Sequence, residues 1–312
     1  MDVLQGLLAP KFWILYVLLL CALYVHFRGR VRHGFVRQLT DHSTFLAPYN
    51  VLMYAFSDVP NTPFVDVARF PELARLRENW ETIRDEAAAL YDTGHVKASE
   101  KYDDLGFNSF FRSGWKRFYL KWYDDFLPSA QKLCPRTVEL LQQTPSINAA
   151  AFTLMSPQSR LVTHRDPLAC SLRYHLGLIT PNSEACQIAV DGQPYVWRDG
   201  EDVVFDETFI HSPVNATDEP RIILFCDVMR PLRFAPIAAL NRFVVRHLVK
   251  ATATRNEEGD KVGALNKLFG GVYRTRLLGK KLKEKSRPTY YALKWLLILG
   301  GLYLIFFRTL IG

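Results

Sequence analysis

A strict alternation of apolar and polar residues over positions 171–178 constrains the fold of this chain more than any other feature. Every second residue from Leu172 to Leu178 is apolar, which is the period of a half-buried β-strand. The opposite face carries Arg173 and His175, a pair that is unusual on a solvent-facing strand but suits the wall of an anion-binding pocket. The segment therefore predicts a sheet with a packed core on one face and a ligand pocket on the other.

Further short strands and turns surround this segment. Residues 186–197 predict a hairpin whose two-residue turn is the Asp191-Gly192 pair. Residues 202–209 and 221–227 predict two more strands. Short strands at this spacing, divided by turns, indicate a small barrel or a double-sheet jelly roll.

Two histidines and one aspartate form a second informative pattern. His164 and Asp166 are two residues apart, so on an extended backbone their side chains point to the same side. His211 follows the strand predicted at 202–209. Two imidazoles and one carboxylate on one face of an open site are the typical ligands of ferrous iron in oxygenases, where positions stay free for oxygen and a co-substrate. Arg221 then supplies a guanidinium that can clamp a carboxylate with two N–H groups, as 2-oxoglutarate requires.

Each of these residues also has a plain structural interpretation. Either histidine, taken alone, is more often a hydrogen-bonded residue of the core or surface. Arg221 alone is more often a strand-end cation that covers apolar surface, and Arg173 can be an ion-pair partner of Asp206 or Glu207. Taken together, and in this order along the chain, these residues favour the binding of iron and 2-oxoglutarate.

Residues 148–232 resemble the aspartyl/asparaginyl β-hydroxylase family. The His-Arg-Asp-Pro form of the motif and the apolar ends of the chain look most like its bacterial branch, the lipid A 2-hydroxylases. The segments that carry the resemblance are Phe152-Thr-Leu-Met-Ser-Pro157, His164-Arg-Asp166, Arg173-Tyr-His-Leu-Gly-Leu178, Phe205-Asp-Glu-Thr-Phe-Ile-His211 and Arg221 to Pro231.

The resemblance implies an α+β fold in which a double-stranded β-helix, a cupin-like jelly roll, carries helices on its flanks. It also implies the site. Iron(II) is expected on His164, Asp166 and His211, which makes these three the catalytic residues, and 2-oxoglutarate on Arg173, His175 and Arg221, with Thr153 as a further contact.

The resemblance further implies a dioxygenase that consumes O2 and 2-oxoglutarate and hydroxylates a fatty acyl chain of lipid A at the 2-position. Two other functions stay open: hydroxylation of an Asp or Asn side chain of a protein, and non-catalytic binding of 2-oxoglutarate by a membrane protein. Animal members that hydroxylate protein side chains have glycine at the position of Asp166, which favours the lipid hydroxylases.

Apolar runs near both ends predict two membrane helices. The first, residues 12–27, is short against the roughly 20 residues of a bilayer span, and the second is residues 290–307. Basic residues follow the first run and precede the second, so the segment between them is expected on the cytoplasmic side. We therefore expect a multi-pass protein of the bacterial inner membrane, with an anchor at 1–27, a cytoplasmic oxygenase domain at 28–288 whose core is 148–232, and a membrane helix at 289–312.

The formal net charge of +8 does not indicate nucleic acid, because much of the excess lies beside the apolar runs and no nucleic-acid-reading module is recognisable. Basic residues beside a membrane helix attract anionic head groups, so the expected partners are the membrane and a lipid substrate. Five cysteines, odd in number and without a CxxC pair, predict reduced thiols. No sequence signal indicates the oligomeric state.

The flanking segments predict secondary structure without assignable chemistry: an amphipathic helix at 71–91, an aromatic-rich strand at 114–123 and a short helix at 135–143. A helix predicted at 236–252 places Arg242, Arg246 and Lys250 opposite an apolar stripe. That pattern fits a helix in a membrane interface and, equally, the solvated face of a helix packed on the core.

Overall fold

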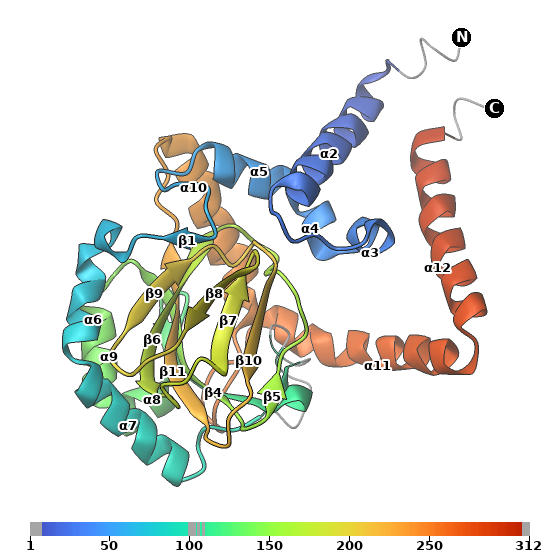
Figure 1. Ribbon diagram of the computed structural model, residues 1–312. Coiled ribbons are helices and arrows are strands. Elements are labelled where there is room, and N and C mark those ends of the chain that lie inside the picture. The colour runs from blue at the N-terminus through green and yellow to red at the C-terminus, as the bar shows by residue number, and fades with distance from the viewer. Residues whose placement is uncertain (1–7, 99–103, 105–106, 108–109, 308–312) are drawn as a thin grey trace.

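Two antiparallel sheets form the centre of the computed structural model (Figure 1), which describes residues 8–98, 104, 107 and 110–307. Side chains from both sheets, including Ile188 and Phe205, meet in one apolar cluster, so the predicted double-sheet jelly roll is confirmed. The seven-stranded sheet has the order β1 (Phe64–Val65), β9 (Asp202–Phe205), β6 (Ser171–Ile179), β11 (Arg221–Met229), β4 (Ile147–Met155), β2 (Trp115–Trp122) and β3 (Asp125–Phe126). The four-stranded sheet has the order β5 (Ser159–Arg160), β10 (His211–Asn215), β7 (Cys186–Val190) and β8 (Gln193–Val196).

The alternation predicted at 171–178 is confirmed in β6. Leu172, Tyr174, Leu176 and Leu178 are buried in the main apolar core. Short helices cover this outer face of the larger sheet and contribute to the same core. They are α6 (Ala74–Glu78), α7 (Trp80–Asp92), α8 (Pro128–Leu133) and α9 (Pro135–Gln142).

The strand predicted at 114–123 is β2 and the helix predicted at 135–143 is α9. The single helix predicted at 71–91 is wrong, because the structure divides it into a 3-10 turn η2 (Pro71–Leu73), α6 and α7. Asn79 has non-helical backbone angles, and its side-chain amide donates to the Arg75 carbonyl at 2.8 Å. A short polar side chain that bonds its own backbone competes with the helix.

The hairpin predicted at 186–197 is confirmed, since β7 and β8 pair on either side of Asp191 and Gly192. Both turn residues have positive φ, 52° and 81°. This is the backbone conformation of a type I′ turn, and the Asp-Gly sequence suits it because glycine has no Cβ to clash.

The strand predicted at 202–209 is too long. β9 ends at Phe205, and the Asp206 carboxylate accepts the backbone N–H of Thr208, which closes a turn. The chain then crosses to the other sheet, where His211 opens β10. The crossing brings His211 into the space between the sheets, opposite β6.

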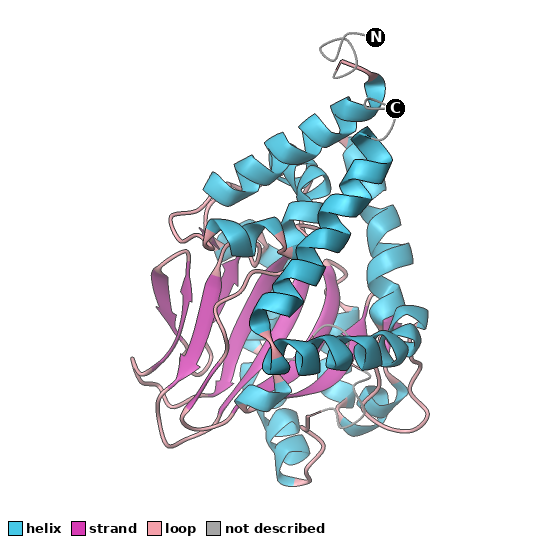
Figure 2. Cartoon of the chain, turned by 90° about the vertical axis from the view of Figure 1, so that its right-hand side faces the viewer, coloured by secondary structure: helices cyan, strands magenta, loops and turns pink. Residues whose placement is uncertain are grey.

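Helices flank the barrel at both ends of the chain. The N-terminal group is α2 (Pro10–Phe27), α3 (Phe35–Leu39), α4 (His42–Phe45) and α5 (Ala47–Ala55), followed by the turn η1 (Val67–Arg69). A second short turn is η3 (Phe111–Ser113). The C-terminal group is α10 (Ala235–Val244), the π-helix η4 (Val245–Val249), the 3-10 turn η5 (Lys250–Thr252), α11 (Ala264–Lys285), α12 (Arg287–Leu302) and the π-helix η6 (Tyr303–Phe307). The uniform helix predicted at 236–252 therefore changes its hydrogen-bond pattern twice. Both views show α2 and α12 rising from the same side of the barrel (Figures 1 and 2).

The prediction of two membrane helices is not confirmed. In the part of the chain that the structure describes, one helix is long and apolar enough to cross a membrane, Arg287–Ile305, and it is not buried against the protein. The apolar helix Phe12–Phe27 is shorter than a span requires. One such helix is weak support for membrane association.

Candidate active site

A backbone bridge between two distant segments brings the histidines together. The His164 N–H donates to the His211 carbonyl at 3.0 Å, and the His211 N–H donates to the His164 carbonyl at 2.7 Å. One ligand atom from each imidazole and one from Asp166 lie within 4.8 Å of one another. Three donors this close can share one ion, and they lie between the two sheets.

The histidine rings are oriented by the backbone. Nδ1 of His164 lies 2.7 Å from the Val162 carbonyl oxygen, and Nδ1 of His211 lies 3.0 Å from that of Phe209. An Nδ1–H that donates to a carbonyl leaves the Nε2 lone pair available, which is the usual arrangement of metal-binding histidines. Both Nε2 atoms lie near Asp166, at 3.7 and 4.0 Å from one carboxylate oxygen.

The protonation states also suit a metal. Burial lowers the pKa of His211 to about 3, and the neighbouring His164 acts in the same direction. Burial likewise lowers the pKa of His164, against the opposing charge of Asp166. Burial alone would raise the pKa of Asp166, but the charge of the Arg173 guanidinium outweighs it and lowers that pKa. Neutral imidazoles and an ionised carboxylate are the forms that bind divalent metal.

The set of donors fits iron(II). Two imidazoles and one carboxylate are the donor set of non-haem iron oxygenases, and three protein donors would leave positions free for other ligands. Asp166 and His164 are the more exposed of the three, with 20% and 16% of their side chains accessible, whereas 6% of His211 is accessible. The site therefore opens on the side of Asp166 and His164.

Arg221 lies in the same pocket as the candidate metal ligands and has no carboxylate partner among the described residues. Its guanidinium is buried, lies 4.4 Å above the Trp197 ring and reaches the Thr153 hydroxyl at 3.4 Å, while Nε has no hydrogen-bond partner in the described chain. Burial lowers the pKa of Arg221 to about 10, so it remains charged at neutral pH. A buried cation of this kind fits a ligand carboxylate.

His175 lies on the same wall. The Trp197 indole N–H donates to its Nδ1 at 3.3 Å, which leaves the proton on Nε2. Burial, reinforced by the charges of Arg173 and Arg221, lowers the pKa of His175 well below its usual range, so the ring is neutral. Its buried Nε2 has no partner within the residues described and is available to donate to a ligand.

Arg173 has a different environment from Arg221. It donates to Asp166 at 2.7 Å, lies 3.1 Å from Asp227 and also contacts Glu207. Asp227 is its direct partner across the β6–β11 ladder. The ion pair with Glu207 is one of the two structural alternatives that the sequence allowed. Arg173 therefore orients a candidate metal ligand rather than presenting an unpaired charge.

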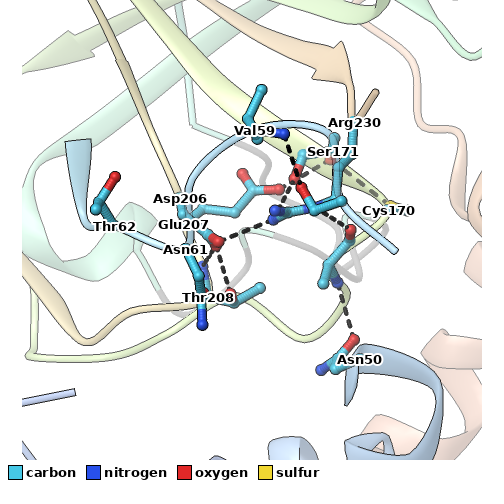
Figure 3. A network of polar contacts seen from close by, with 12 residues as sticks. Asn50, Val59, Asn61, Thr62, Cys170, Ser171, Asp206, Glu207, Thr208 and Arg230 are labelled. Atoms are coloured by element: carbon cyan, nitrogen blue, oxygen red, sulfur yellow. Dashed lines mark hydrogen bonds and ion pairs between the residues drawn. The ribbon is translucent and has the colours of Figure 1, made fainter. Parts of the chain in front are cut away.

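Asp206, the other suggested partner of Arg173, pairs with other arginines, in the network of polar contacts shown in Figure 3. It pairs with Arg28, at the end of α2, at 2.5 Å and with Arg230 at 2.9 Å. Arg230 also donates to the carbonyls of Ala169 and Ser171. The network ties the crossing segment before His211 to the segment that carries Asp166.

Asp227, Trp197 and Phe110 were not predicted from the sequence, and Glu207 was named only as an alternative ion-pair partner of Arg173. The Phe110 ring lies 4.7 Å from the His164 ring. Glu207 and Asp227 carried a signal, since buried-strand patterns seldom contain acids without a partner. Nothing in the spacing indicated that Asp227 would also face Arg173.

A family model and several proteins are similar in sequence to this chain. A family model described as Aspartyl/Asparaginyl beta-hydroxylase matches residues 77–231. An ornithine lipid ester-linked acyl 2-hydroxylase of Rhizobium tropici is 30% identical over 216 residues, which are 66% of this chain and 75% of that protein. Human aspartate beta-hydroxylase domain-containing protein 2 is 28% identical over 216 residues, 65% of this chain and 57% of the relative. Human aspartyl/asparaginyl beta-hydroxylase is 30% identical over 168 residues, 52% and 22% respectively, so this chain spans only part of the two human proteins.

Solved structures show more distant similarity. A Pseudomonas putida prolyl-4-hydroxylase aligns with 53% of this chain and 98% of its own length, at 13% identity and a TM-score of 0.35. A cupin domain of a transcriptional regulator from Enterobacter cloacae aligns with 37% and 96%, at 11% identity and a TM-score of 0.26. Both scores are low, and the fold described above rests on the sheets of this chain.

Proposed function

Because this chain belongs to the aspartyl/asparaginyl β-hydroxylase family and is a dioxygenase hydroxylase, we propose that it uses iron(II) and 2-oxoglutarate to hydroxylate a fatty acyl chain of a membrane lipid. One observation carries the proposal. The same pocket holds three convergent candidate metal ligands and, beyond them, a buried guanidinium that has no carboxylate partner among the described residues.

His164, Asp166 and His211 would hold the iron. Arg221 and Thr153 would bind the distal carboxylate of 2-oxoglutarate, and the Nε2–H of His175 would donate to the same molecule. Arg173 keeps Asp166 ionised and oriented, because its guanidinium donates to that carboxylate. When bound, iron and 2-oxoglutarate supply the oxidation: one oxygen atom of O2 enters succinate, which forms with CO2, and the other becomes the new hydroxyl group.

The residues around the centre exclude water. Phe110, Trp197 and Phe225 line the pocket, and apolar walls of this kind protect a reactive centre from side reactions. The opening beside Asp166 is where the target carbon would enter.

A lipid is the favoured substrate for two reasons. The relative from Rhizobium tropici is named as an acyl 2-hydroxylase of an ornithine lipid, and Arg287–Ile305 is a candidate membrane span. We propose lipid A or an ornithine-type lipid as the acyl carrier, with the 2-position as the site. The proposed location is the cytoplasmic face of the bacterial inner membrane, and the anchor at 1–27 and the domain at 28–288 remain part of this proposal.

Hydroxylation of an Asp or Asn side chain is the second candidate, since one human relative is named an aspartyl/asparaginyl beta-hydroxylase. The test that separates the two uses the purified full chain with iron(II), 2-oxoglutarate and, in parallel, lipid A, an ornithine lipid or Asp/Asn peptides. We expect one lipid to gain a single oxygen atom, matched by one succinate. Oxygen found on a peptide alone would overturn the lipid proposal.

A further inference from the structure

A larger cavity adjoins the catalytic pocket. Its volume is about 590 Å³, within the range of small-molecule sites. The two cavities share Phe107, Phe110, Asp166, Arg173 and Glu207. They therefore meet at the exposed side of the candidate metal ligands, at the end of the catalytic pocket away from Arg221.

Away from this junction most of the wall surface is apolar. They include Trp122 of β2, Leu168 before β6, Leu248 and Val249 of η4, and Leu265 of α11. A peptide in such a chamber would leave many of its backbone N–H and C=O groups without partners, which is costly. A hydrocarbon chain has no polar groups to satisfy and gains from leaving water.

The rim of this cavity lies next to helices that have exposed apolar side chains, as a membrane-facing surface would. α11 leads directly into α12, and His42 of α4, a helix packed against α2, also lines the chamber. Leu248 is 54% exposed at the rim. Phe35 and Phe45, on α3 and α4, are also more than half exposed. Apolar side chains left in contact with solvent beside two apolar helices fit a lipid surface.

We propose that this chamber holds the hydrocarbon tail of the acyl substrate, with the carbon to be hydroxylated at the Asp166 end and the tail extending toward Leu248 and Leu265. Val249 and Leu265 then set the length of chain that the enzyme accepts. The inference rests on the proposed lipid hydroxylation and adds the position of the chain to it.

The first test measures hydroxylation of a series of acyl esters that differ only in chain length. In Val249→Trp and Leu265→Trp the larger ring occupies chamber volume. Each methylene that no longer fits should lower kcat/KM about fourfold, so long chains lose at least tenfold while the shortest substrate stays within about twofold of wild type. Leu278→Trp, an exposed position on the same helix α11 outside the chamber, should leave the whole series unchanged.

The second test does not depend on turnover. A fatty ester with a diazirine at its terminal carbon is photolysed with the full chain in detergent, and the labelled peptide is identified by mass spectrometry. We expect label between residues 248 and 265 or at Leu168, reduced in Val249→Trp and not in Leu278→Trp.

The outcomes separate the two proposals. If wild type hydroxylates lipids but the tryptophan variants keep its chain-length profile, the chamber assignment is wrong and the function stands. Label on other surfaces alone also refutes the chamber. If wild type labels the chamber but hydroxylates only peptide, the chamber binds an acyl chain and the lipid hydroxylase proposal fails.

Discussion

Arg173 and Arg221 lie on neighbouring strands and line the same pocket, but their guanidinium groups have different neighbours. Arg173 is surrounded by Asp166, Glu207 and Asp227. Arg221 has an aromatic ring and a hydroxyl group beside it and no carboxylate in the described chain. Burying a charge without a partner costs stability. Arg173 therefore belongs to the charge network that orients Asp166, whereas we propose that Arg221 binds an anionic ligand.

Both arginines flank the candidate iron site. Substitution of an iron ligand there is expected to have the largest effect on activity. His211→Ala should lower lipid hydroxylation by more than about 100-fold, because even partners of metal ligands are worth 10- to 100-fold. Iron content after desalting should fall in parallel. His247→Ala, an exposed histidine of η4, is the matched control and should retain both. Wild-type iron affinity in His211→Ala would contradict the assignment.

Arg173→Met tests the structural side of the comparison. The substitution leaves the buried Glu207 and Asp227 and the partly exposed Asp166 without their common cation, so the free energy of unfolding should fall by about 3–5 kcal/mol. Chemical denaturation of the metal-free protein measures it. Arg84→Met removes a largely exposed ion pair with Asp85 and should cost no more than about 1 kcal/mol. A stable Arg173→Met protein whose defect is weak 2-oxoglutarate binding would reverse our assignment.

Arg221→Met tests the ligand side. Loss of one desolvated charged contact is worth about 2 kcal/mol or more, so the KM for 2-oxoglutarate should rise at least roughly 30-fold. The ligand-free protein should be as stable as wild type or more stable, since the substitution removes a buried unpaired charge. Arg160→Met, on exposed β5, should change neither quantity. A large loss of stability with an unchanged KM would show that Arg221 is structural.

The smallest effect concerns the Arg28–Asp206–Arg230 network, where the charges are paired within the protein. Burial opposes ionisation of Asp206, but Arg230 and Arg28 outweigh it and lower its pKa. A carboxylate with a lowered pKa stabilises the fold above its unfolded value of about 3.9 and loses that contribution as pH falls toward the folded value. The stability difference between wild type and Asp206→Asn should therefore shrink below about pH 4, by at most about 1.4 kcal/mol per pH unit. Denaturation curves at several pH values measure the difference, and parallel pH profiles would refute the role of Asp206.

Local sequence determined much of the fold. The alternation at 171–178 specified the two faces of β6, because successive side chains of a strand point to opposite sides. The Asp191-Gly192 turn specified the β7–β8 hairpin through the positive φ of its two residues. The ligand set was also visible in the sequence, since His164, Asp166 and His211 are chemically distinctive, although spacing alone does not show that they converge.

Only the tertiary structure decided what each charge does. Asp227 and Glu207 follow Arg173 by more than thirty positions in the sequence and reach it through strand pairing and the crossing segment before His211. Arg221 has no such acidic neighbours among the described residues. No pattern in the sequence shows that a residue will lack a partner in the folded protein. The acyl chamber likewise arises from β2, η4 and α11, which are distant in the chain. Local residues fix backbone conformation, whereas burial and charge balance depend on what the folded chain brings together.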